Sequence, residues 1–117
     1  MKTILVLEDE DGIRDVLNVL LSIEGYRVIE SSSINDFNLT KGIHDADLYM
    51  LDVRLPDGSG IDVCNSLKCT HNVPVILMSA HAKTCEIEKS CNPEAFVSKP
   101  FDIDELLAKV RILIGPA

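Results

Sequence analysis

The chain has 117 residues, a length typical of one domain with a single hydrophobic core. It contains 11 lysines and arginines against 19 aspartates and glutamates, so its formal net charge is -8 at pH 7. This balance argues against direct nucleic-acid binding, which needs cations on the protein, and no apolar run approaches the ~20 residues of a membrane-spanning helix. The first apolar run, residues 4–7, is too short for an export signal. We therefore expect a cytoplasmic domain that contacts neither membranes nor nucleic acid.

Five short apolar segments, rich in β-branched residues, are predicted to be strands. They are residues 4–7, 26–29, 47–51, 73–78 and 95–97. Three of these segments are apolar without alternation, which is typical of strands buried on both faces of a parallel sheet. The sequence therefore indicates a sheet covered by other elements on each side.

Apolar side chains at helical spacing predict a helix after each strand. The signals lie at residues 13–21, 33–37, 61–67, 82–91 and 103–114. The fourth signal is the weakest, because few apolar residues stand among its lysines and glutamates. Asp102 is expected to cap the last helix, with Glu105 three residues later as in a capping box.

This alternation of strands and helices indicates an α/β fold of the doubly wound kind. The prediction is a (βα)5 arrangement, in which right-handed crossovers place helices on both faces of a five-stranded parallel sheet. No linker, repeat or low-complexity stretch interrupts the pattern, so residues 1–117 are expected to form one domain.

Reactive side chains follow the predicted strands at their carboxyl ends, where open parallel sheets bind ligands. These residues are Glu8 and Asp9, Asp52, Ser79 and Lys99. Crowded carboxylates raise one another's pKa, and a hard divalent cation such as Mg2+ relieves their repulsion. An ammonium and a hydroxyl beside them suit a dianionic phosphoryl group. The pattern predicts a site for Mg2+ and a phosphoryl group, with one carboxylate as the nucleophile.

Four segments together resemble the receiver domain of two-component response regulators. They are residues 4–11 (ILVLEDED), 51–60 (LDVRLPDGSG), 75–80 (VILMSA) and 96–101 (FVSKPF). They occur in the family's order, and the resemblance covers essentially the whole chain. It implies that residues 1–117 form a single receiver domain with a flavodoxin-like sheet in the strand order 2-1-3-4-5.

The resemblance also implies a role for each residue of the acidic site. Asp52 matches the aspartate that accepts a phosphoryl group from a histidine kinase or phosphotransfer protein. Asp9 matches the direct Mg2+ ligand, and Glu8 matches the acid that assists it, often through water. Arg54 stands where the family supplies a backbone carbonyl to the metal.

Three further residues match the parts of a receiver that bind the phosphoryl group and switch. Lys99 matches the lysine on the phosphoryl oxygens, Ser79 the switch hydroxyl, and Phe96 the aromatic residue that turns inward on activation. The peptide before Pro100 is often cis in the family. The implied output is a surface of the fourth helix, fifth strand and fifth helix, which controls a downstream protein or a fused effector domain and allows a homodimer. Such a domain is not an enzyme beyond its own phosphorylation and dephosphorylation.

Other interpretations stay open on the residues alone. The acids of residues 8–11 also fit a solvated cap on the first helix, Lys99 a surface position and Phe96 a core position. The stretch from Ser79 to Lys99 is shorter than usual in the family, and Asn92-Pro93 replaces its usual Gly-Ala. These departures keep a non-switching interaction module as the alternative. An aspartate-nucleophile phosphatase is disfavoured, because position 54 carries Arg instead of a second acid.

Overall fold

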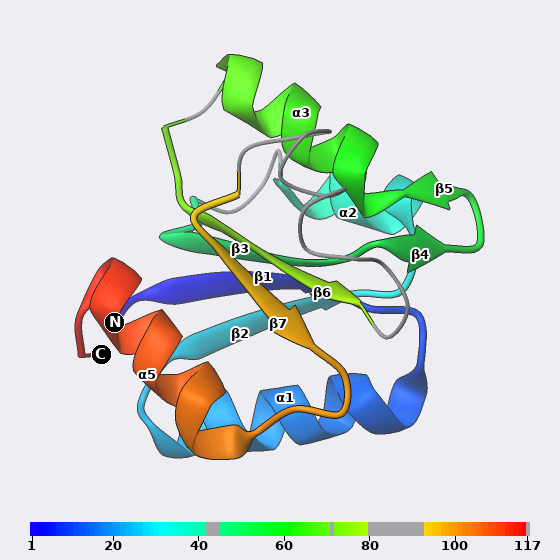
Figure 1. Cartoon of the computed structure of the whole chain (residues 1–117). Helices are drawn as coiled ribbons and strands as arrows, with labels where there is room; N and C mark the ends of the chain where they lie inside the picture. Colours follow the sequence, from blue (N-terminus) through cyan, green and yellow to red (C-terminus); the bar gives the residue numbers. More distant parts are fainter. Residues whose placement is uncertain (42–44, 71, 80–92, 117) are drawn as a thin grey trace.

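The computed structural model describes residues 1–41, 45–70, 72–79 and 93–116. Five parallel strands form its central sheet in the order β2-β1-β3-β6-β7 (Figure 1). Their bounds are β1 Thr3–Leu7, β2 Arg27–Ser31, β3 Leu48–Asp52, β6 Val75–Ser79 and β7 Ala95–Ser98. Numbered within this sheet alone the order is 2-1-3-4-5, so the predicted doubly wound topology is confirmed.

Four helices of the described residues cover the two faces of the sheet. They are α1 Asp11–Ile23, α2 Ile34–Lys41, α3 Gly60–Thr70 and α5 Ile103–Ile114. Figure 1 shows α1 and α5 on one face and α2 and α3 on the other. The predicted fourth helix, residues 82–91, lies outside the described residues, as does Asn92.

Two hydrophobic cores, one on each face, hold these layers together. Alternate residues of each strand point to opposite faces, so Val6 and Met50 join the core under α1 and α5, while Leu7 and Leu51 join the other. Leu17 of α1 belongs to the first core. The interior strands β1, β3 and β6 are buried along their whole length, as their unalternating apolar sequences predict.

Two helix ends are fixed by local hydrogen bonds. The Asp102 side chain accepts a hydrogen bond of 2.9 Å from the backbone N–H of Glu105, which confirms the predicted cap of α5. Gly25 follows α1 with a φ of 95°, a left-handed conformation that glycine adopts without a Cβ penalty. Its N–H donates to the carbonyl of Ser22, so the chain turns directly into β2.

A small antiparallel hairpin, which the sequence pattern did not predict, follows β3. Its strands are β4 (Arg54–Leu55) and β5 (Gly58–Ser59). Asp57, in its turn, accepts hydrogen bonds from the backbone N–H groups of Ile34 and Asn35 at 2.9 and 3.1 Å. These bonds lower the pKa of the Asp57 carboxyl and cap the start of α2. The hairpin therefore ties the chain after Asp52 to a neighbouring helix.

Within the described residues, the structure has no helix with the length and apolar character needed to cross a membrane.

Candidate metal centre

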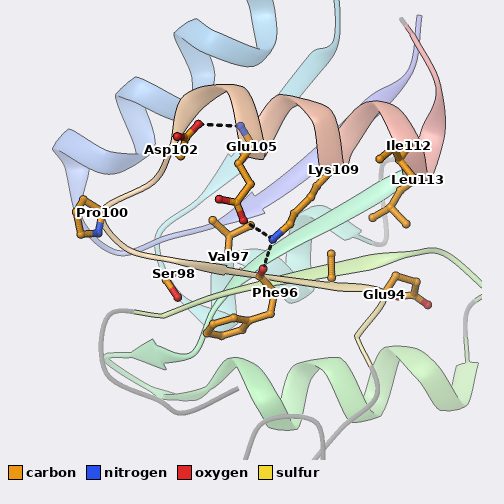
Figure 2. A pocket seen from close by; sticks show the side chains of 11 residues that line it. Glu94, Phe96, Val97, Ser98, Pro100, Asp102, Glu105, Lys109, Ile112 and Leu113 are labelled. Atoms are coloured by element: carbon orange, nitrogen blue, oxygen red, sulfur yellow. Dashed lines mark hydrogen bonds and ion pairs between the residues drawn. The ribbon is translucent and has the colours of Figure 1, made fainter. Parts of the chain in front are cut away.

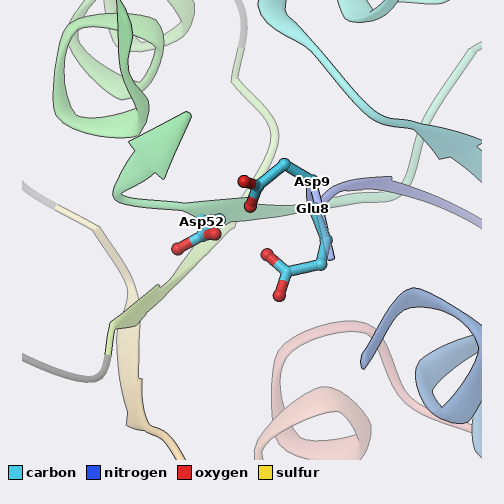
Figure 3. A group of neighbouring side chains, drawn as sticks. All are labelled: Glu8, Asp9 and Asp52. Atoms are coloured by element: carbon cyan, nitrogen blue, oxygen red, sulfur yellow. The ribbon is translucent and has the colours of Figure 1, made fainter. Parts of the chain in front are cut away.

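Three carboxylates meet at the carboxyl edge of the sheet. Glu8 and Asp9 directly follow β1, and Asp52 is the last residue of β3. The two strands are hydrogen-bonded neighbours, with Leu7 paired to Leu51, so their ends lie side by side. One oxygen from each carboxylate lies within 4.8 Å of the other two, and Figure 3 shows the three side chains turned toward one another. The three carboxylates that were expected to meet at the ends of the strands therefore lie together.

Burial divides these acids unequally. The Glu8 side chain is fully buried and Asp52 is nearly so, whereas Asp9 is exposed. Burial, helped by the carboxylate of Asp52, raises the pKa of Glu8 to about 8 against the opposing effect of Lys99. Burial and Asp52 also raise the pKa of Asp9. Without a cation, the site therefore retains a proton near neutral pH.

Lys99 is the positive charge inside the cluster. It follows β7, and its Nζ lies 2.6 Å from Glu8 Oε1 and 3.2 Å from Asp52 Oδ2. Burial lowers the pKa of this ammonium, but the two carboxylates outweigh that effect and the net pKa is raised. The backbone N–H of Lys99 donates to the Ser79 carbonyl at 3.0 Å, which fixes the end of β7 against β6. The peptide between Lys99 and Pro100 is cis, as the resemblance implied.

One buried oxygen shows that the protein groups do not complete the site. Among the described residues, Glu8 Oε2 is the buried side-chain polar atom that has no hydrogen-bond partner. An orphaned carboxylate oxygen in a dry site costs free energy. A divalent cation with oxygen ligands would satisfy it, and the three carboxylates are the donor set that Mg2+ prefers. The residues present therefore fit the predicted Mg2+.

Ser79 and Phe96 lie on β6 and β7, the two strands that follow β3 in the sheet. Ser79 ends β6 and is 5% exposed, and β6 pairs with the strand that carries Asp52. Phe96 is half-buried in β7 and packs against the core on the α2–α3 side. Its carbonyl accepts a 2.7 Å hydrogen bond from Lys109 of α5, at a cavity of about 690 Å³ over β7 and α5 (Figure 2).

Gly60 packs so closely against the backbone of Asp52 that it has no room for a side chain. The N–H of Gly60 donates to the Val53 carbonyl at 2.9 Å, and a Cβ on Gly60 would lie 2.0 Å from the backbone oxygen of Asp52. Arg54 begins β4 two residues past Asp52, and its N–H donates to Asp52 Oδ1 at 3.4 Å. A metal-binding role for the Arg54 carbonyl stays a prediction.

Sequence reasoning missed two residues that shape this site. Gly60 stood inside the quoted segment of residues 51–60, but its close approach to Asp52 has no sequence signal beyond the glycine itself. The second residue is Arg14, which the sequence analysis did not name. It is the single cation of α1 and lies one turn after the acids, and this position could have drawn attention to it. Its Nη1 donates to the backbone carbonyl of Glu8 at 2.9 Å.

A doubly wound parallel sheet with buried carboxylates and a lysine at its carboxyl edge is the arrangement expected of a signalling domain that accepts a phosphoryl group. The family model described as the response regulator receiver domain matches residues 4–111. The chain therefore belongs to the receiver domain family of response regulators. This assignment confirms the predicted receiver function and disfavours the non-switching alternative.

Curated relatives agree with this assignment. The KDP operon transcriptional regulatory protein KdpE of Escherichia coli is 35% identical over 116 residues, which cover 97% of this chain and 52% of that protein. The response regulator ArlR of Staphylococcus aureus is 32% identical, over 97% of this chain and 53% of that protein. The chain spans about half the length of the curated relatives it matches.

Solved structures share the fold. The response regulator TrrA of Thermotoga maritima, in a complex with Mg2+ and BeF, is 30% identical with a TM-score of 0.85, covering 97% of this chain and 99% of that chain. The chemotaxis protein CheY4 of Vibrio cholerae has a TM-score of 0.88 at 18% identity, covers 97% and 98% of the two chains, and supports the fold alone.

Proposed function

We propose that Asp52 is the phosphoryl acceptor of this receiver domain and that the donor is the phosphohistidine of a histidine kinase or phosphotransfer protein. An Asp52 carboxylate oxygen attacks the phosphorus in line, and the phosphorus–nitrogen bond breaks. The electron pair of that bond stays on the imidazole nitrogen, and the product is an acyl phosphate on Asp52. The single observation that carries this proposal is the cluster of Glu8, Asp9 and Asp52 with its orphaned Glu8 oxygen.

Mg2+ fits the same proposal. Glu8, Asp9 and Asp52, with the backbone carbonyl of Arg54, would hold it. When bound, it supplies neutralisation of the charge on the transferring phosphoryl group. The TrrA structure, a complex with Mg2+ and BeF, supports this choice of cation by relationship.

Lys99 and Ser79 are proposed to bind the phosphoryl oxygens. Lys99 Nζ is already 3.2 Å from Asp52 Oδ2, so an ammonium stands where the phosphoryl charge arrives. Ser79 ends the strand beside Asp52 and would donate its hydroxyl. The movement of Ser79 frees space for Phe96 to turn inward, and this couples the site to the surface over β7 and α5. That surface would act on a fused effector domain, a downstream protein or a second copy. Like its family, the domain performs no chemistry beyond gaining and losing its own phosphoryl group.

Phosphotransfer measured by intact-protein mass spectrometry tests the acceptor. The wild-type chain is incubated with acetyl phosphate and Mg2+, and separately with a radiolabelled histidine kinase. We expect one phosphoryl group per chain, no labelling of Asp52→Asn and none after chelation of Mg2+. Equal labelling of wild type and Asp52→Asn would remove Asp52 from this role.

A second measurement tests the switch. Beryllofluoride with Mg2+ mimics the phosphorylated carboxylate. Backbone amide chemical shifts are therefore compared by NMR before and after its addition. We expect shifts at Ser79 and Phe96 in the wild type and none in Asp52→Asn. Labelling without shifts at these residues would leave an acceptor that does not switch.

A further inference from the structure

We infer that Arg14 is a positioning residue for the metal centre, because it fixes the peptide that joins Glu8 to Asp9. The inference rests on the proposed Mg2+ site. The hydrogen bond and ion pairs of Arg14 go to the Glu8 carbonyl, Asp11 and Glu30. Arg14 acts on the backbone from which two of the three carboxylates project.

The contacts of Arg14 converge on the turn between β1 and α1. Its Nη1 donates to the Glu8 carbonyl at 2.9 Å, and its Nη2 pairs with the carboxylate of Asp11. Its Nε lies 4.0 Å from Glu30 on β2, and Glu30 also accepts a 2.8 Å hydrogen bond from Asn18. The Arg14 side chain is only 16% exposed. A guanidinium with five donors can hold these three acceptors together, which a single ammonium cannot do as well.

The Glu8 backbone is thus held from both sides. Its N–H donates to the Ser31 carbonyl of β2 at 3.0 Å, and its carbonyl accepts from Arg14. With both peptide groups fixed, Glu8 is directed into the buried site and Asp9 toward its exposed rim. Groups that orient metal ligands from behind typically change metal affinity by ~10- to 100-fold when they are removed.

Charge alone makes the opposite prediction. Arg14 is a cation near a cation site, so its only electrostatic effect on bound Mg2+ is repulsion. If Arg14 acted as a charge, its removal would strengthen Mg2+ binding. If it positions the ligands, its removal weakens binding. The sign of the change separates the two.

The metal-free chain is titrated with Mg2+ alone, and the affinity is measured from the backbone amide chemical shifts in NMR spectra. Comparison of the variants gives the sign of the change in affinity. We expect Arg14→Ala to bind Mg2+ about tenfold more weakly than wild type. We expect Arg14→Lys to lie between them, because it keeps one donor. Because saturating Mg2+ itself orders the ligands, the labelling rate of Arg14→Ala with acetyl phosphate should return to within about twofold of wild type at high Mg2+.

Arg111→Ala is the matched control. It also removes one arginine paired with a glutamate, Glu24 at 3.4 Å, but at the opposite end of α1 from the acids. Its Mg2+ affinity should equal that of wild type. Urea unfolding establishes that each variant is folded, and if Arg14→Ala is not, Arg14→Lys provides the comparison.

Unchanged or tighter Mg2+ binding in the folded Arg14 variants would overturn the positioning role. An equal loss in Arg111→Ala would overturn it too, since the effect would then be one of general charge or stability. If wild type itself binds no Mg2+, the proposed function fails, and this outcome is distinct from failure of the Arg14 inference.

Discussion

Proton release on Mg2+ binding should be measurable, because the buried Glu8 holds a proton that the cation must displace. The pKa of Glu8 is raised from 4.5 to about 8, mainly by burial. Near pH 7, about one Glu8 in ten is therefore ionised, and each pH unit below that lowers the ionised fraction about tenfold. Mg2+ affinity should accordingly rise about tenfold from pH 6 to pH 7 and level off above about pH 8.

The same shift has a defined sign for stability. Between about pH 4.5 and pH 8, the unfolded chain has released the Glu8 proton and the metal-free folded chain retains it. Because the folded state then binds more protons, the free energy of unfolding falls as the pH rises through this range. Saturating Mg2+ should abolish this trend, because the metal-bound folded chain, like the unfolded chain, no longer holds the Glu8 proton.

Isothermal calorimetry in buffers of different ionisation enthalpy measures both the affinity and the protons released. We expect close to one proton per Mg2+ near pH 6, falling toward zero above pH 8. Glu8→Gln, which keeps a ligand oxygen but cannot ionise, should bind more weakly, with most of the pH dependence removed. An affinity in wild type that varies less than about twofold between pH 6 and pH 7 would refute the reasoning, since Glu8 would then already be ionised.

Two substitutions test the packing that supports the site. Gly60→Ala places a Cβ 2.0 Å from the Asp52 backbone oxygen, so urea unfolding should show that the free energy of unfolding falls by about 1–3 kcal/mol. The control is Gly12→Ala, which has nothing within 4 Å of its Cβ and should be neutral or stabilising. Equal effects of the two substitutions would contradict the close approach. Tyr26→Phe removes a 2.6 Å hydrogen bond to the Gly115 carbonyl after α5 and should lower the free energy of unfolding by about 1 kcal/mol in the same assay. An unchanged urea midpoint would show that this bond does not help to hold the end of the helix.

The sheet was predictable because its interior strands are apolar on both faces. The predicted segment 47–51 overlaps β3, and 73–78 overlaps β6. The boundary errors were largest at β6, observed at Val75–Ser79, and at β2, predicted at 26–29 and observed at Arg27–Ser31. β2 is an edge strand, and its end is set by pairing with β1 up to Ser31, so polar residues can occupy it without an apolar signal. The hairpin of β4 and β5 was missed because two-residue strands have no periodicity.

The site was predictable as a set of residue types but not as an arrangement. Strand ends brought Glu8, Asp9, Asp52 and Lys99 together because parallel strands end at one edge. Residue chemistry alone does not show which of the adjacent acids Glu8 and Asp9 is buried, yet Glu8 is fully buried and Asp9 is exposed. Successive side chains leave an extended backbone on opposite sides, and only the surrounding layers decide which side is dry. The cap interpretation describes only the end of the acidic run: Asp11 lies exposed in the first turn of α1, while Glu10, the residue before α1, makes no side-chain cap hydrogen bond.

A buried acidic cluster must be stabilised before its metal arrives, and three features share that task. A proton neutralises Glu8, Lys99 pairs with Glu8 and Asp52, and Arg14 holds the backbone behind the acids. Lys99 Nζ lies closer to Glu8, at 2.6 Å, than to Asp52, at 3.2 Å. Mg2+ bound at Glu8 in place of that proton would repel the nearby ammonium of Lys99, which could then turn to the oxygens on Asp52. We therefore expect metal binding and phosphoryl binding to be coupled through one lysine, because Mg2+ would help the acceptor reaction by releasing Lys99 as well as by its own charge.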